Sequence, residues 1–241
     1  ADGDLYYVNS REAKAVQTEA RFHVSGKIPE LWHADTGTGE PVSYRIEGDT
    51  TIIPFDLLAN ESVFVVFREP AMTQSATIAA ANWTEVADLG QTWQISFDGL
   101  AAPSPIASGT LGSLSDNADP AVKYFSGTTT YRSSLTLPKG AKPGAPLKLD
   151  LGTVGDVAEV YVNGQLAGTA WKAPYCVDIG GFAKKGANNI EIRVANLWVN
   201  RLIGDAQPGA QKVTFTAAST YKADAPLRRS GLIGPVTLWG Q

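Results

Sequence analysis

The residues with the clearest chemical potential are aromatic and lie close together in the C-terminal half of the chain. Trp171, Tyr175 and Trp198 occur there, with Asn200 and Arg201 nearby. Sugar-binding surfaces use such residues, because the apolar C–H face of a pyranose packs on an aromatic ring while polar neighbours bind its hydroxyls. We therefore identify these residues as a candidate carbohydrate-binding patch. The alternative is that the rings fill a β-sandwich core or a seam between domains.

Metal-ligating residues are sparse. The two histidines, His23 and His33, have no cysteine partner at a zinc-site spacing, and His33 is interpreted as a residue at the edge of a turn. Asp116, Asn117 and Asp119 could offer oxygen ligands to calcium. Their segment lacks the length and ligand order of an EF-hand, which favours a solvated loop. We expect no metal or other cofactor in this chain.

Patterns of nucleophilic or acid–base catalysis are also missing. There is no Gly-x-Ser-x-Gly elbow, and the glycines at 152 and 155 lack the Lys-Ser/Thr of a phosphate-binding loop. Paired carboxylates could hydrolyse glycosides, but 24 acids in 241 residues make chance pairs common. The single cysteine, Cys176, is interpreted as a small buried hydrophobe. We assign no catalytic residue.

The elements that would position the aromatic patch are strands. Ala158, Val160 and Val162 alternate with polar or amphipathic residues, which is the period-2 pattern of a half-buried strand. Asn163-Gly164 follows, a pair typical of a type I′ hairpin turn. A second alternating run begins near Ile190. Residues 156–200 are therefore predicted to form the centre of an antiparallel β-sandwich.

The rest of the chain divides into two predicted all-β domains. Residues 1–72 are predicted to form a small β-sandwich unit, in which strict alternation over residues 15–24 favours a strand over the alternative of a helix. A shift to small and polar residues marks the boundary. Residues 73–241, with about eight predicted strands, fit a jelly-roll β-sandwich. Within it we expect loops at 101–112, 138–146 and 201–211 and a strand at 212–216.

Composition excludes some functions. The net charge of −4 gives no basic face for nucleic acid, and no apolar run of about 18 residues could span a membrane. The chain carries no signal-peptide pattern. Localisation stays unknown, with a preference for a periplasmic or secreted bacterial protein.

Several segments resemble known glycoside hydrolases. VYVNGQLAG, WKAPYCVDI and SGLIGPVTL resemble the galactose-binding-like jelly roll found in the β-galactosidase clan. The ordered series WQISFD, DPAVKYFSGTTTYRSSLTLP and NLWVNRLIGD resembles the C-terminal region of the family 106 α-L-rhamnosidases. FHVSGKIPELWHADTG and ESVFVVFRE resemble the β-unit that precedes that jelly roll.

The resemblance implies a parent enzyme that hydrolyses terminal α-L-rhamnosyl groups with inversion. Its catalytic barrel, with paired acidic residues and a calcium ion, would precede this region. The present sequence shows no alternation of strands and helices, so no catalytic residue can be carried over. We expect a C-terminal fragment. Its implied partners are the catalytic barrel of the parent chain and a rhamnose-containing glycan or glycoside.

Three functions follow from these observations. The first is a non-catalytic accessory region that supports the barrel and contacts carbohydrate. The second is an autonomous carbohydrate-binding module. The third is a purely structural spacer whose apolar seam the barrel covers. An exposed apolar patch would favour the first or third function, and binding of a free sugar would favour the second.

Overall fold

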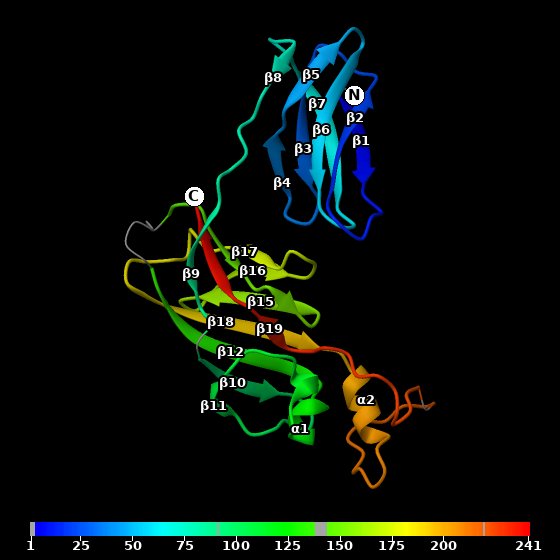
Figure 1. The fold of residues 1–241 in the computed structure, drawn as a ribbon, viewed down its shortest axis with the longest axis vertical. Helices are drawn as coiled ribbons and strands as arrows, with labels where there is room; N and C mark the ends of the chain where they lie inside the picture. Colours follow the sequence, from blue (N-terminus) through cyan, green and yellow to red (C-terminus); the bar gives the residue numbers. More distant parts are fainter. Residues whose placement is uncertain (1–2, 91, 138–143, 219) are drawn as a thin grey trace. The chain divides into compact units, whose positions relative to one another are not determined.

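The computed structural model describes residues 3–90, 92–137, 144–218 and 220–241, and it is an all-β structure (Figure 1). The chain divides into two compact units, Ala1–Ala81 and Asn82–Gln241. Among the described residues, no helix has the length and apolar character that crossing a bilayer requires.

The first unit is a sandwich of two four-stranded antiparallel sheets, ordered β1-β7-β3-β4 and β2-β6-β5-β8. Its core lies between the sheets and includes Phe22, Phe55 and Phe67, all buried. The strands are β1 (Asp4–Asn9), β2 (Val16–Phe22), β3 (Lys27–His33), β4 (Thr38–Pro41), β5 (Tyr44–Glu47), β6 (Thr50–Leu57), β7 (Ser62–Pro70) and β8 (Ser75–Ala76).

The alternating run near the N-terminus is a strand, β2, as predicted, and it pairs with β6 along its whole length. The alternative of a helix there is wrong, because the strand's apolar side chains face the core while its charged ones face solvent. The predicted boundary at residue 72 precedes β8. Since β8 pairs with β5, residues 75–76 lie in a sheet of the first unit.

The second unit is a larger sandwich. Its six-stranded sheet has the order β11-β10-β12-β18-β15-β16, and a four-stranded sheet, β17-β13-β20-β9, packs on it. The strands are β9 (Thr84–Asp88), β10 (Trp93–Asp98), β11 (Ile106–Gly109), β12 (Gly127–Thr136), β13 (Leu147–Asp150), β14 (Thr153–Val154), β15 (Val157–Val162), β16 (Gln165–Ala170), β17 (Cys176–Asp178), β18 (Ala187–Asn196), β19 (Leu232–Gly234) and β20 (Thr237–Gly240). The helical elements are η1 (Leu114–Asp116), α1 (Pro120–Lys123) and α2 (Val199–Asp205).

The central stretch forms the strands that its alternation predicts. Val160 on β15 and Ile192 on β18 pair directly and are fully buried. Asn163 and Gly164 form the hairpin turn, with φ values of 53° and 84°. These values match a type I′ turn, which requires positive φ at both central residues. The turn joins β15 to β16, and β18 occupies the other edge of β15.

A buried asparagine at the start of β18 connects two turns. The Nδ2 of Asn188 donates to the carbonyl oxygens of Lys184 (2.9 Å) and Gly186 (3.0 Å). Its Oδ1 accepts from the Lys184 N–H (2.8 Å) and from Asn163 Nδ2 (2.9 Å). Asn188 thereby satisfies buried polar groups of the 184–186 turn and ties that turn to the Asn-Gly hairpin.

Three predictions about the second unit are wrong. The loop predicted at 201–211 begins within helix α2, where the Leu202 N–H donates to the Trp198 carbonyl. The strand predicted at 212–216 does not form, because the Val213 and Thr214 N–H groups bind the Asp205 carboxylate instead of a neighbouring strand. The loop predicted at 101–112 contains β11, which pairs with β10. Most of the loop predicted at 138–146 lies outside the described residues.

The role of Asn188 predicts a large loss of stability in Asn188→Leu. The substitution leaves the Lys184 N–H without its acceptor, removes one of the two acceptors of Asn163 Nδ2 and deprives the Lys184 and Gly186 carbonyls of their donor, so we expect about 2–3 kcal/mol of destabilisation. Amide hydrogen exchange of β15 and β18 measures it. Asn189→Ala is the matched control, because the Asn189 side chain is exposed, and it should change stability by less than about 0.5 kcal/mol. Equal protection in both variants would contradict the role assigned to Asn188.

Candidate functional site

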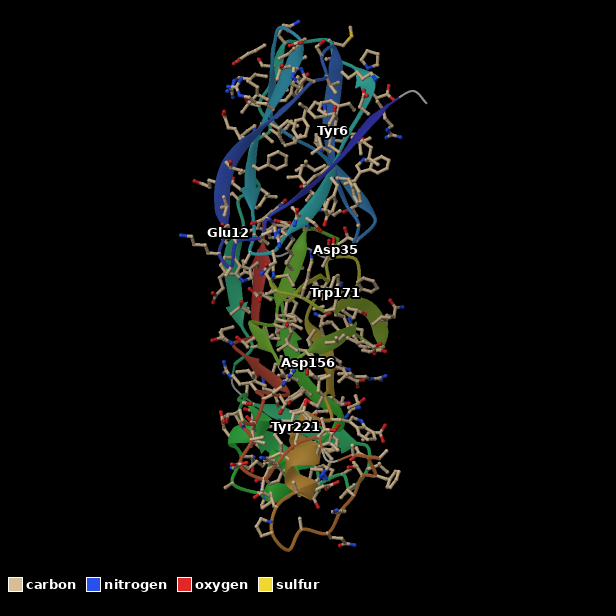
Figure 2. All side chains as sticks on the ribbon, turned by 90° about the vertical axis from the view of Figure 1, so that its right-hand side faces the viewer. Tyr6, Glu12, Asp35, Asp156, Trp171 and Tyr221 are labelled. Carbon is tan, nitrogen blue, oxygen red and sulfur yellow. The ribbon has the colours of Figure 1, made fainter. Side chains whose placement is uncertain are left out.

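The two tryptophans of the predicted patch come from the same end of the larger sheet. Trp171 follows Ala170, which pairs with Ala158 at the start of β15. Trp198 follows the end of β18, where Ala195 pairs with Val157. Both indoles are exposed, Trp171 at 54% and Trp198 at 53%, and Figure 2 labels Trp171. The interpretation of these two rings as core residues is therefore wrong.

A second buried asparagine, Asn196, fixes the segment that carries Trp198. Its Nδ2 donates to the Gly127 carbonyl (3.0 Å) and to Thr129 Oγ1 (2.9 Å), both on β12. Its Oδ1 accepts from the Gly231 N–H (2.8 Å). The end of β18 is thus tied to a neighbouring strand and to the 228–231 segment, which holds the start of α2 in place.

Asn200 has structural contacts in place of the sugar contacts expected from the sequence. It is 2% exposed. Its Nδ2 donates to the Arg228 carbonyl (2.7 Å), and its Oδ1 accepts from the Arg228 N–H (2.8 Å). In this reciprocal pair the side-chain amide of Asn200 donates to and accepts from the backbone of one residue, as a backbone peptide group does. The pair ties α2 to Arg228 and leaves the Asn200 amide no free side for a ligand.

Arg201 is likewise held by the fold. Its guanidinium donates to Asp205 Oδ1 from Nε at 3.0 Å, and both side chains are almost fully buried. Asp205 Oδ2 accepts from the Thr214 hydroxyl and from the Thr214 and Val213 N–H groups. Burial raises the pKa of Asp205, but these hydrogen bonds and the Arg201 charge outweigh it and hold the pKa below its usual value.

The remaining residue of the patch, Tyr175, is half-buried and packs against the sandwich core. Asp156, which sequence analysis did not single out and which Figure 2 labels, lies directly before β15 and accepts a hydrogen bond from the backbone of Leu197, the residue before Trp198. Burial raises its pKa, while a hydrogen bond from the Leu197 backbone and the charge of Arg228 partly offset this effect. The candidate site therefore consists of the exposed indoles of Trp171 and Trp198, with Asp156 held against the backbone that precedes Trp198.

The other groups that could do chemistry have structural roles. Burial, followed by the nearby charge of Asp150, raises the pKa of Cys176 to about 11, so its thiol is protonated at neutral pH and is a poor nucleophile. In the acidic segment, Asp119 caps α1 by accepting the Ala121 N–H (2.9 Å), and Asn117 accepts the Asp119 N–H (2.9 Å). Among the residues that the structure describes, no cluster of three or more His, Cys, Asp or Glu side chains could hold a metal ion.

A cavity of about 860 Å³ lies over the outer face of the larger sheet. The charged residues of its lining are bound to one another, because Glu191 accepts from Arg132 (2.7 Å) and from Arg193 (2.7 Å). The guanidinium of Arg193 also stacks 4.2 Å from the Tyr161 ring. With its charges paired to one another, this face is interpreted as solvated surface.

Comparisons with known proteins agree with this fold. Residues 1–46 match the glycoside hydrolase family 106 model, described as alpha-L-rhamnosidase. Residues 113–229 match the model described as "Glycosyl hydrolase 2 galactose-binding domain-like". The second match covers most of the larger sandwich, including the segment with Trp171 and Trp198.

A solved structure decides the relationship. The chain is 51% identical to a rhamnosidase from Novosphingobium sp. PP1Y, with a TM-score of 0.95, over 100% of this chain. The chain is related to the family 106 α-L-rhamnosidases. It spans 23% of that rhamnosidase. It is also 34% identical over 176 residues to a Formosa agariphila protein named "Putative beta-glucuronidase", covering 62% of this chain and 15% of that protein.

The relationship bears out the resemblance to rhamnosidases and the galactose-binding-like β-sandwich. Sequence reasoning about this rhamnosidase-related chain missed Asp205 and Arg228, which fix the α2 segment. Asp205 stands at the end of the NLWVNRLIGD motif, and its spacing of four residues from Arg201 is the usable signal. No local pattern points to Arg228.

The contacts of Asp205 predict a pH-dependent stability of the α2 segment. The folded pKa is lowered, so this contribution is present above the unfolded pKa of about 4 and is lost as pH falls through the folded pKa. Asp205→Asn should destabilise the segment by about 3 kcal/mol at pH 7, because Arg201 stays buried without its partner. Hydrogen exchange of the Leu202 and Ala206 amides, at pH 7 and near pH 3, measures both effects.

At the lower pH the difference between the wild-type chain and Asp205→Asn should shrink, since the wild-type carboxyl then takes up a proton. Asp224→Asn is the control, because the Asp224 side chain is exposed. A difference between wild type and Asp205→Asn that stays constant from pH 7 to pH 3 would contradict the charged role of Asp205.

Proposed function

We propose that this chain is a non-catalytic accessory β-region of an α-L-rhamnosidase, an enzyme acting on terminal α-L-rhamnosyl groups. The observation that carries the proposal is the extent of the match: all of this chain aligns with 23% of a rhamnosidase. Most of that enzyme lies outside the matched region, and its catalytic domain can lie there. The proposed partner is a catalytic barrel, which this region supports.

The use of carboxylates in the fold supports a non-catalytic role. Inverting glycosidases need one carboxylic acid and one carboxylate about 6.5–9.5 Å apart across a sugar-binding cleft. Around α2, Asp205 is committed to Arg201 and Thr214. Asp150 and Asp178 each accept the N–H of the glycine two residues later, at 2.8 Å and 2.9 Å. These three acids stabilise turns and a helix and are not available as a catalytic pair.

The exposed indoles support a contact with carbohydrate, the second part of the proposal. Trp171 and Trp198 present large apolar rings to solvent at one end of a rigid sheet. Rigid aromatic rings bind the C–H face of a sugar with little loss of side-chain entropy. We propose that they contact a rhamnose-containing glycan or glycoside, with Asn200 and Arg201 positioning the Trp198 segment. The same feature also favours the alternative, an autonomous carbohydrate-binding module.

The accessory role predicts that this chain alone does not hydrolyse p-nitrophenyl α-L-rhamnopyranoside. We expect a rate equal to that of buffer, measured by release of p-nitrophenol. The related Novosphingobium rhamnosidase is the positive control. Turnover that survives repurification and is lost on substitution of an aspartate or glutamate of this chain would contradict the proposal.

The carbohydrate contact predicts weak binding of methyl α-L-rhamnopyranoside, with a Kd of about 1 mM or weaker for a single sugar. Trp171→Ala and Trp198→Ala should each weaken it about five-fold, measured by isothermal titration calorimetry. Leu166→Ala, which removes an exposed side chain from β16, is the matched control. Unchanged titrations in both tryptophan variants would contradict this contact while leaving the accessory role in place.

A further inference from the structure

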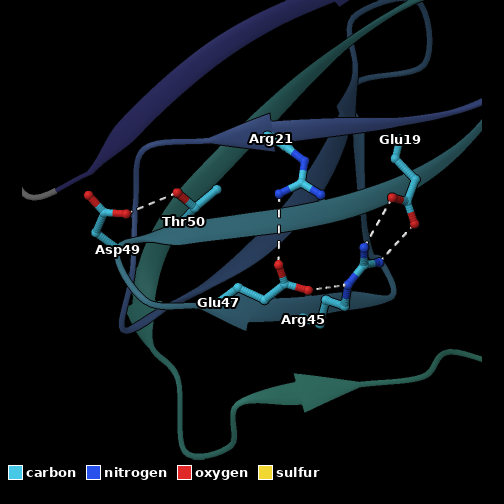
Figure 3. A network of polar contacts seen from close by, with 6 residues as sticks. All are labelled: Glu19, Arg21, Arg45, Glu47, Asp49 and Thr50. Atoms are coloured by element: carbon cyan, nitrogen blue, oxygen red, sulfur yellow. Dashed lines mark hydrogen bonds and ion pairs between the residues drawn. The ribbon is translucent and has the colours of Figure 1, made fainter.

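The two outer faces of the first unit differ in character. The β2-β6-β5-β8 sheet carries a charged network in which Arg45 donates to Glu19 (2.8 and 3.0 Å) and to Glu47 (2.9 Å) (Figure 3). Arg21 lies 3.7 Å from Glu47. The hydrogen bond from Arg45 lowers the pKa of Glu19. Because each charge meets its opposite, this face needs no partner and is solvated surface.

The outer face of the other sheet carries aromatic rings. Tyr7 on β1 pairs with Phe64 on β7, and Phe64 pairs with Trp32 on β3, so the three lie in a row across the strands. The Tyr7 and Phe64 ring centroids are 5.4 Å apart. Trp32 is 37% exposed. At the end of the row Trp32 pairs with Gly39 on β4.

The Trp32 indole is held in one orientation by polar and steric contacts. Its Nε1 donates to Glu30 Oε2 (3.0 Å), and the same oxygen accepts from Arg68 (3.2 Å). The Arg68 guanidinium lies 4.8 Å from the centre of the ring. A Cβ on Gly39 would stand 3.0 Å from the indole, which is a tight contact, so glycine at this position lets the ring lie close over β4. The ring is therefore preorganised.

A cavity of about 600 Å³ opens beside this indole. Its apolar lining includes Ile28, Pro41 and Phe64. Its polar lining includes Glu30, Arg68 and a His33–Glu40 pair, whose Nε2 and Oε1 atoms are 3.0 Å apart. A volume of a few hundred Å³ with one fixed aromatic ring and a few polar groups is typical of small-molecule sites.

We propose that this cavity binds a pyranosyl group of a neutral glycan, with the C–H face of the sugar packed against Trp32. Glu30 accepts from, and Arg68 donates to, the sugar hydroxyls. A neutral sugar fits best, because Arg68 is already paired with Glu30 and Glu40 adds a further carboxylate to the lining, whereas an anionic ligand would need a cation that is not already paired. The proposal goes beyond the accessory role and is independent of Trp171 and Trp198.

The test uses the full chain carrying Trp171→Ala and Trp198→Ala, so that the two indoles proposed to contact sugar on the second unit are removed. Methyl α-L-rhamnopyranoside and methyl β-D-galactopyranoside are the probes, followed by saturation-transfer-difference NMR up to about 50 mM, where a millimolar Kd approaches saturation. We expect saturation transfer to the C–H protons of at least one probe, and the strongest transfer to the protons on one face of its ring.

Adding Trp32→Ala should weaken this binding about five- to ten-fold. Gly39→Val keeps the indole but places a side chain against it, and it should have a similar effect if Trp32→Ala does not fold. Tyr7→Ala removes an exposed ring from the same sheet face outside the cavity and should leave binding within about two-fold.

Three outcomes would overturn the proposal: no saturation transfer to either probe, transfer that is unchanged by both Trp32→Ala and Gly39→Val, or transfer that is lost equally in Tyr7→Ala. Sedimentation equilibrium covers the case of a protein occupant. A dimer of the starting chain that Trp32→Ala returns to monomer would assign this face to a second copy of the chain instead.

Discussion

Buried asparagines at both ends of one central strand organise the second unit. Asn188 stands at the second position of β18 and Asn196 at its last. Each side chain satisfies backbone groups of turns or neighbouring strands that would otherwise be buried without a partner, at a cost of about 1–3 kcal/mol each. One strand thus fixes the Asn-Gly hairpin at one end of the sheet and the α2 segment at the other.

This constraint separates polar residues that build the fold from aromatic residues that are open to a ligand. The NLWVNRLIGD motif contains Asn200, Arg201 and Asp205. The Arg201 side chain donates to Asp205, Asp205 also accepts from the Thr214 N–H, and Asn200 donates to the Arg228 carbonyl. Trp198 in the same motif points its ring to solvent instead. The motif therefore encodes a rigid polar platform that carries one exposed aromatic ring.

Local periodicity was enough to predict the strands, but not the helix and loops that follow them at the ends of the sheet. Alternation identified β2, β15 and β18, since period 2 is a property of neighbouring residues. Helix α2 escaped prediction because its contacts reach Arg228, 28 positions beyond Asn200. The Trp32 cavity depends on Arg68, 38 positions from Glu30. The exposure of Trp171 and Trp198 also could not be predicted from the sequence, because loop residues have no periodicity that assigns their side chains to one face of a sheet.

The most direct test of this account is the ¹H–¹⁵N spectrum of the chain during titration with methyl α-L-rhamnopyranoside. The account predicts shifts of the exposed indole N–H signals of Trp171, Trp198 and Trp32. The fully buried Trp93 and the side-chain amides of Asn188 and Asn200 should stay in place. A spectrum in which no exposed indole moves, or in which the buried asparagine amides respond first, would contradict a rigid polar scaffold with open aromatic platforms.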